Sequence, residues 1–366
     1  MTESINVHQP KVCVVLLQWN HAGETIRCLE SLAGLAYHSL KIIVVDNGSH
    51  AAELDQLMEW TRAQAGVSNL NTGWGTWCRV IDEQGGKLSD THARDAEVFP
   101  FPLMVICESV NKGFAEGNNV GIRHALREDN PEFVWLLNND TEVTSDALSV
   151  MVNAMRREPS FGVLQSCLLN AKERGRIDSL GIGIRRRSSV VDEKQGEILS
   201  IDPSSDPRLI LEGFGACAAS ALFRACVLQS VGLFDPAFFA VFEDADLAFR
   251  IRYAGWRAGV AIAAVVYHKR GVSGRKGNGK ESRHARLLKY RNATALKIQH
   301  WPFPLLVFSP GVCIVLAKAL LLAAREGTVW ETLLFWTRSL RQRCGRRSAR
   351  NTIFNRWADH PLEKLE

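Results

Sequence analysis

The chain has 366 residues, of which 46% are hydrophobic and 23% charged, and its formal net charge is +5. This composition excludes a disordered chain, and the length suits one large α/β domain with an appendage, or two domains. The nine cysteines are scattered without a CxxC pair, which argues against a zinc or disulfide framework and indicates a reducing compartment. Residues 1–10 are polar, so no signal peptide is expected.

The first regular segment reads as a βαβ unit. Apolar strands are expected at 12–17 and 41–46, with a helix between them that Gly34 ends. This order predicts a parallel sheet with a right-handed crossover. The strands end in Gln18-Trp19-Asn20 and in Asp46-Asn47. No GxGxxG follows the first strand, which argues against a dinucleotide-binding oxidoreductase.

Residues 66–103 interrupt this rhythm with glycines and prolines, and we interpret them as an insertion that holds a hairpin. A third strand at 103–107 leads to Asn111-Lys112-Gly113 and a helix at about 115–128. Glycine there permits close approach of a ligand, and Lys112 suits a phosphate. A plain helix N-terminus with solvated asparagines explains this segment equally well.

Residues 133–137 are five apolar side chains in a row and predict a strand buried on both faces, which stops at Asn138-Asn139-Asp140. Ligands of open α/β sheets bind beyond the carboxyl ends of the strands. Three polar groups at such an end therefore indicate a site, although an ordinary Asx turn before a helix gives the same letters. Further on, small residues around Gly215 permit tight packing or close approach of a substrate.

Acidic residues gather at a predicted helix N-terminus, Glu243-Asp244, where the macrodipole favours carboxylates. Helix capping is the alternative role. Asp246 and Arg250 have the i, i+4 spacing of an ion pair. A last strand at 260–267 ends at His268 and runs into a loop rich in Lys and Arg.

In order and spacing, these pieces resemble the inverting glycosyltransferases of family 2, which have the GT-A fold. The matching pieces are Val14–Asn20, Val44–Ser49, Asn111–Ile122, Leu136–Asp140, Gly232–Asp235, Phe242–Leu247 and Tyr267–His268. The resemblance spans residues 12 to about 292 outside the insertion. Through Lys289–Asn292 it is most similar to rhamnosyltransferase-type enzymes of bacterial surface polysaccharides. It implies a mostly parallel α/β sheet flanked by helices.

The resemblance also implies an activity. A hexosyltransferase-type enzyme would transfer a sugar, rhamnose in the subgroup named, from a UDP- or dTDP-sugar to a hydroxyl of a glycan or lipid-linked glycan, with inversion. Asp244 matches the catalytic base, with Glu243 and Gly215 on the acceptor side. Asp140 and His268 would hold Mg²⁺ or Mn²⁺, although only the last acid of the family's Asp-x-Asp motif is present. The donor-binding positions would be Asn20, Asp46, Asn111, Lys112, Gly113, Asn138 and Asn139.

The predicted domains are 1–292, the GT-A domain, and 293–366, a helical basic and apolar segment. Residues 301–324 carry a single charge, and 325–350 carry seven Arg against two Glu. Attachment to an anionic membrane surface at its cytoplasmic face is the main expectation, ahead of a membrane span or a core helix. No nucleic-acid partner is expected. The rival functions are an inactive GT-A scaffold at the membrane and a nucleotidyltransferase.

Overall fold

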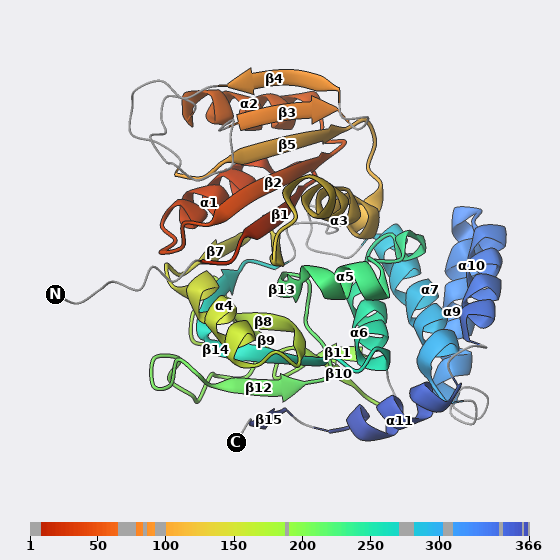
Figure 1. The fold of residues 1–366 in the computed structure, drawn as a ribbon. Coiled ribbons are helices and arrows are strands. Elements are labelled where there is room, and N and C mark those ends of the chain that lie inside the picture. Colours follow the sequence, from red (N-terminus) through yellow and green to blue (C-terminus); the bar gives the residue numbers. More distant parts are fainter. Residues whose placement is uncertain are drawn as a thin grey trace.

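A mixed sheet of thirteen strands forms the centre of the chain in this computed structural model (Figure 1). The structure describes residues 9–64, 78–82, 86–91, 100–186, 190–270, 282–302, 310–343, 347–360 and 362–364. The strand order is β15 (Glu363–Lys364), β12 (Ile210–Gly213), β14 (Arg257–His268), β8 (Phe161–Asn170), β13 (Ser220–Arg224), β6 (Phe133–Asn138), β1 (Val12–Gln18), β2 (Leu40–Asn47), β5 (Leu103–Glu108), β3 (Cys78–Asp82) and β4 (Lys87–Thr91). In addition, β7 (Thr141–Val143) pairs with β14 and β9 (Ile177–Ser179) with β8, while β10 (Ile182–Ile184) and β11 (Val190–Asp192) form a separate pair.

The strands β3, β5, β2, β1 and β6 run parallel, so their carboxyl ends share one edge of the sheet. Gln18 of β1 lies opposite Asp46 of β2, and Leu17 lies opposite Asn138 of β6. The predicted parallel α/β fold with polar strand ends at one edge is confirmed. We call this edge, with the loops that join it, the strand-end edge.

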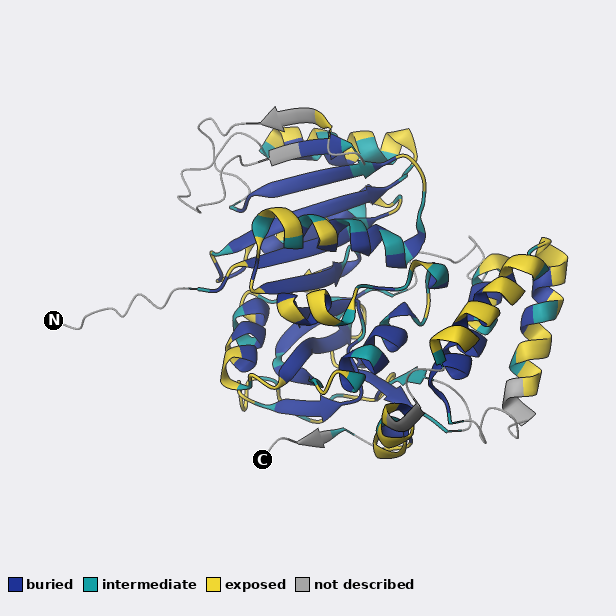
Figure 2. Ribbon diagram, turned by 45° about the vertical axis from the view of Figure 1, so that its right-hand side comes forward, coloured by how far each residue is buried: buried dark blue, intermediate teal, exposed yellow. Residues whose placement is uncertain are grey.

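Helices cover both faces of the sheet because successive residues of each buried strand point to opposite sides. One face, which includes Val14 and Leu16, packs on α1 (Ala22–Ala33), α2 (Ala51–Gln64) and α4 (Ala147–Arg157). The other, which includes Val15, packs on α3 (Gly113–His124), α5 (Ala225–Val231) and α6 (Glu243–Tyr253). A short π-helix at Ala125–Asp129 continues α3, and a 3-10 turn at Pro236–Phe238 precedes α6. Both strand faces are thereby buried (Figure 2).

The insertion contains the expected hairpin. Strands β3 and β4 pair antiparallel, and β3 extends the sheet by pairing parallel with β5. The rest of the insertion, at 65–77, 83–85 and 92–99, lies outside the described residues.

The C-terminal segment packs closely on the rest of the chain. The helices of this part of the chain are α7 (Arg283–His300), which begins before the predicted segment, α9 (Pro310–Glu326), α10 (Val329–Arg343) and α11 (Arg347–Trp357). After them, β15 joins the main sheet beside β12. The predicted domain boundary at 292/293 falls inside α7, and the two-domain division stays a prediction. Of the apolar run at 301–324, residues 303–309 lie outside the described part. Among the helices that are described, none combines the length and apolar character that crossing a membrane requires.

Candidate active site

Asp46 lies at the strand-end edge with both carboxylate oxygens engaged. The amide nitrogen of Gln18 donates to Asp46 Oδ1 at 3.0 Å, and the Ser49 N–H donates to Asp46 Oδ2 at 3.2 Å. Both side chains are buried. The Gln18 Oε1 atom is also buried and finds no hydrogen-bond partner among the described residues.

Asn47 links this edge to the turn that begins α3. Its amide nitrogen donates to Asn111 Oδ1 at 3.0 Å and to the Gly113 carbonyl at 3.1 Å, and its Oδ1 accepts the Lys112 N–H at 3.0 Å. The structure therefore brings Asn111, Lys112 and Gly113 beside Asp46. The Lys112 ammonium pairs with the buried Glu108 carboxylate. Contact between Lys112 and a phosphate remains a prediction.

Two predicted donor-side amides hold neighbouring segments in place. The backbone of Asn20 is left-handed (φ 57°), and its side-chain Oδ1 accepts the His50 N–H at 2.9 Å. Asn139 donates to the Thr25 hydroxyl at 2.9 Å, which ties the strand end to α1. Asn138 lies near His268, with its amide nitrogen 3.4 Å from His268 Nε2.

Asp140 and His268 come together although they are far apart in the sequence. The Nε2 atom of His268 lies 3.1 Å from Asp140 Oδ1, and its Nδ1 atom lies 2.8 Å from Asp178 Oδ2. β7 brings them together, because Thr141 pairs with His268 across the two strands. Burial alone would lower the pKa of His268, but its bonds to the two carboxylates raise that pKa to about 9.

The spacing of Asp140 and His268 is also that of two ligands of a divalent cation, which would bind in place of the proton that the raised pKa keeps on His268. Ligands about 2.1 Å from an octahedral ion lie about 3 Å from one another, which is the spacing of Asp140 Oδ1 and His268 Nε2. Asp178 would act on the ion through the imidazole, as carboxylates behind ligating histidines do. Among the residues described, no group of three or more His, Cys, Asp or Glu is arranged to hold a metal. Two protein ligands are typical of sites that a diphosphate completes.

Alternating charges extend from this pair toward α6. Arg270 Nε contacts Asp178 Oδ1 at 2.9 Å, and its Nη2 contacts Asp192 Oδ2 at 2.5 Å. The Asp192 charge in turn acts on Asp244. Residues 271–281 of the predicted basic loop lie outside the described residues.

Asp244 lies at the first turn of α6, beside the strand-end edge. Its Oδ2 accepts the Ala218 N–H at 3.4 Å, and the neighbouring Ala219 carbonyl accepts the Asn138 N–H at 2.9 Å. Burial and then the Asp192 charge raise the pKa of Asp244 above its usual range. Burial and then the Asp244 charge raise the pKa of Glu243, whose Oε2 has no hydrogen-bond partner in the described structure. Glu243 is thus a buried carboxyl and Asp244 a half-buried one at the start of the same helix.

Asp246 is a structural residue in this arrangement, as predicted from its spacing to Arg250. Arg250 Nε donates to Asp246 Oδ2 at 2.8 Å, and His300 Nε2 lies 3.0 Å from Oδ1. Burial would raise the pKa of Asp246, but these partners hold it well below its usual range. Gly215 packs against the same helix, because a Cβ there would lie 2.4 Å from that of Ala248.

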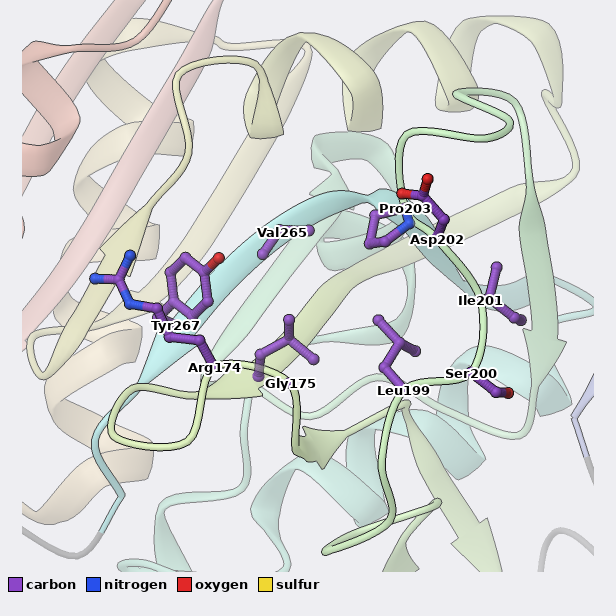
Figure 3. Close-up of a pocket in the computed structure, with 10 residues that line it drawn as sticks. Arg174, Gly175, Leu199, Ser200, Ile201, Asp202, Pro203, Val265 and Tyr267 are labelled. Carbon is purple, nitrogen blue, oxygen red and sulfur yellow. The ribbon is translucent and has the colours of Figure 1, made fainter.

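Two pockets border Tyr267, the neighbour of His268. One, of about 320 Å³, reaches Asp140 between α1 and the end of β14. The other, of about 490 Å³, lies over β8 and β14 and is lined by Tyr267, Val265 and the 199–203 loop (Figure 3). Arg174 covers the Tyr267 ring at 4.3 Å from its centroid. Asp244 lines neither of these two pockets.

Sequence reasoning did not identify Gln18, Asn47, Asp178 and Asp192 as parts of this site. Gln18 and Asn47 adjoin predicted strand ends, which was an available signal. Asp178 and Asp192 lie in a polar stretch without strong periodicity, so only the folded chain brings them to His268 and Asp244.

Comparison with known proteins gives three kinds of match. The family model "Glycosyltransferase like family 2" matches residues 93–287. A curated relative, the low-salt glycan biosynthesis hexosyltransferase Agl10 of Haloferax volcanii, is 24% identical over 148 residues, which are 39% of this chain and 44% of that protein. Less than half of the relative's length is therefore matched.

The first of two similar solved structures shares the fold. The crystal structure of GalNAc-T7 with UDP, GalNAc and Mn²⁺ superposes with a TM-score of 0.57 at 11% identity, covering 96% of this chain and 59% of that one. The mannosyltransferase PcManGT of Pyrobaculum calidifontis, in complex with GDP-Man and Mn²⁺, has a TM-score of 0.48 at 15% identity, covering 97% and 89%.

Proposed function

Because the chain belongs to the glycosyltransferase-like family 2, we propose that it transfers a hexose from a nucleoside-diphosphate sugar to a hydroxyl, with inversion. The observation that carries the proposal is the meeting of three groups at one edge. Asp46, the Asp140–His268 pair and Asp244 come from distant parts of the chain and lie on the strand-end edge or the loops that join it. A buried ion pair alone would not require that convergence.

The proposed reaction is a single displacement. The acceptor hydroxyl oxygen attacks the anomeric carbon as its proton passes to Asp244, and the bond to the diphosphate oxygen breaks. A bound divalent cation would neutralise charge on the departing diphosphate. Asp140 and His268 would hold that cation, Mg²⁺ or Mn²⁺, and the GalNAc-T7 structure, which contains Mn²⁺, supports this choice. Asp46 and the free Gln18 Oε1 would orient the nucleotide base.

The donor sugar and the acceptor are finer proposals. The Lys289–Asn292 segment favours a UDP- or dTDP-sugar such as the rhamnosyl donor, and the glycan-pathway relative supports a glycan or lipid-linked glycan acceptor. Glu243 is buried next to Asp244, and its Oε2 has no hydrogen-bond partner among the described residues, which supports an acceptor-side role. A thermal-shift screen of UDP-, dTDP- and GDP-sugars, with and without Mn²⁺, tests the donor. A ligand at 100 times its Kd stabilises by about 2.7 kcal/mol.

Attachment to an anionic membrane surface at the cytoplasmic face is the proposed location. The outward face of α10 carries Trp330, Leu333, Leu334 and Leu340, all exposed, while its Phe335 and Trp336 face the core. Figure 2 shows exposed residues along the outer sides of the C-terminal helices. The exposed Arg341 lies among these apolar residues. Apolar area flanked by cations is the combination that anionic lipid attracts.

The rival reading is a scaffold that keeps the fold without turnover. The contact of Asp140 with His268, together with the place of Asp244 beside the strand-end edge, favours the enzyme. Release of nucleoside diphosphate from a nucleotide-sugar by purified protein separates the two, because a scaffold binds the donor without hydrolysing it.

A further inference from the structure

The backbone that leads into α6 is strained. Phe239, Val241 and Phe242 have φ values of 62°, 74° and 73°, in the left-handed region that favours glycine. For a β-branched residue such as Val241 this conformation is a genuine outlier. Such backbone persists only where its surroundings hold it, and it clusters at functional sites. The proposed base, Asp244, follows two residues after Phe242.

One side chain of α7 holds this strained segment. The Asn292 amide nitrogen lies 2.7, 2.8 and 2.9 Å from the carbonyl oxygens of Phe238, Ala240 and Val241. Its two hydrogens can serve two of these acceptors fully and share the third. Asn292 is completely buried, so no water competes for the amide.

Arg291, on the same helix, holds the segment as well, and we call Asn292 and Arg291 together the clamp. Its Nη2 donates to the carbonyls of Ala237 and Phe238 at 2.8 and 3.1 Å, and its Nε donates to Asn292 Oδ1 at 3.0 Å. The last bond fixes the orientation of the Asn292 amide, with its nitrogen toward the strained segment.

The far side of the segment touches the donor side of the site. The Phe239 carbonyl accepts the Ala115 N–H at 3.0 Å, and a Cβ at Gly113 would lie 2.5 Å from that oxygen. The segment is therefore held between α7 and the Asn111–Gly113 turn. Phe242, the N-cap residue of α6, has no side-chain capping bond, so the start of that helix depends on the segment before it.

We propose that Asn292 is a positioning residue for catalysis, which fixes the strained Phe239–Phe242 segment and thereby the place of Asp244. The inference rests on the proposed function through the role of Asp244. Residue 292 lies beyond residue 287, where the family match ends, and the resemblance through Lys289–Asn292 gives the Asn292 amide no role in positioning Asp244. A movement of about 1 Å in a catalytic group is enough to lower a rate about 100-fold.

The test compares Asn292→Ala with a control on the same helix. Gln299→Ala removes another buried α7 amide, which donates to Ser339 of α10 at 3.1 Å and does not touch the segment. Donor turnover is followed as nucleoside diphosphate released from the best substrate of a UDP-, dTDP- and GDP-sugar panel with Mn²⁺. Melting temperature, UDP affinity and amide exchange of residues 237–246 are measured on the same samples.

Asn292→Ala is expected to lower kcat about 10- to 100-fold while KM for the donor and UDP affinity change less than about twofold. Amide exchange of residues 237–246 should become faster. Gln299→Ala should lower the melting temperature with kcat within about twofold of the natural chain. Asn292→Gln, which keeps the amide but displaces it by one methylene, serves if the alanine variant does not fold, and its kcat should also fall.

Unchanged kcat in a folded Asn292 variant overturns the proposal, and so does an equal loss of kcat in Gln299→Ala. Asp244→Asn is measured alongside. If Asp244→Asn is inactive and the Asn292 variants are not, only the clamp fails. If Asp244→Asn turns over at the natural rate, the base assignment fails, and the clamp proposal, which rests on it, falls with it.

Discussion

The Nε2 atom of His268 lies 3.1 Å from Oδ1 of Asp140, in the spacing of two neighbouring ligands on one cation. The two residues meet because the short strand β7 folds back from the end of β6 onto β14. Asp178 holds the other ring nitrogen at 2.8 Å and so fixes the face that His268 presents.

This relationship predicts a graded effect on metal binding. Asp140→Ala should abolish Mn²⁺ binding in the presence of UDP, and His268→Ala should weaken it less strongly. Asp178→Asn should weaken it about 10- to 100-fold, because it acts through the imidazole. Calorimetry provides the affinities, with Glu142→Gln, an exposed carboxylate on β7, as the control. If Asp140→Ala binds Mn²⁺ as tightly as the natural chain does, the proposed cation site is wrong.

Asp246 should matter for stability more than for chemistry. Asp246→Asn leaves Arg250 and His300 without their buried carboxylate, and breaking such a pair costs about 3–5 kcal/mol. The folded pKa of Asp246 lies below the ordinary 3.8, so the stability it contributes is present above that value and lost as pH falls through the folded pKa. Denaturant unfolding should show the largest difference from the natural chain near neutral pH. An equal difference at low pH would contradict this.

Much of the fold could be predicted because it follows from local apolar runs. Residues 133–138 and 12–18 are buried on both faces, and a chain of such runs separated by helices allows little besides a parallel sheet. The polar residues at the strand ends could be predicted too, because each apolar run stops at them.

The rest depends on contacts that only the folded chain makes. Asp178 and Asp192 come from a stretch without periodicity, and Asn292 acts on a backbone segment about fifty residues away. The left-handed Phe242 has no sequence signal, since aromatic residues rarely adopt that conformation.

Turnover should depend on pH through Asp244. The proposed base must be ionised, and burial together with the Asp192 charge raises its pKa. The rate should therefore fall as pH decreases, with a midpoint above the ordinary 3.8. Asp192→Asn should move that midpoint to lower pH, whereas Asp202→Asn, in an exposed loop, should not. A pH profile of kcat for the three proteins tests this, and an unmoved midpoint in Asp192→Asn counts against it.

Membrane attachment should depend on the outward face of α10. The natural chain should sediment with anionic liposomes and be partly released by salt, because exposed charge attraction is screened. Replacing Leu333 and Leu334 by Ser should reduce sedimentation, since both side chains are exposed on the outward face of α10. Ile198→Ser alters an exposed apolar residue elsewhere and should have no effect. If all three proteins sediment equally, or if none sediments at low salt, the outward face of α10 is not the membrane-binding surface.

The central claim is that Asp244 is the base of a glycosyl transfer, and turnover of Asp244→Asn tests it most directly. Nucleoside diphosphate released from the best nucleotide-sugar of the panel is measured with Mn²⁺ for the natural chain, Asp244→Asn and Glu243→Gln. General-base help is worth about 10²–10⁴ in rate, so Asp244→Asn should lose that factor while donor affinity changes little. If Glu243→Gln loses the factor instead, the base is one residue earlier. Natural turnover in both variants would contradict the mechanism.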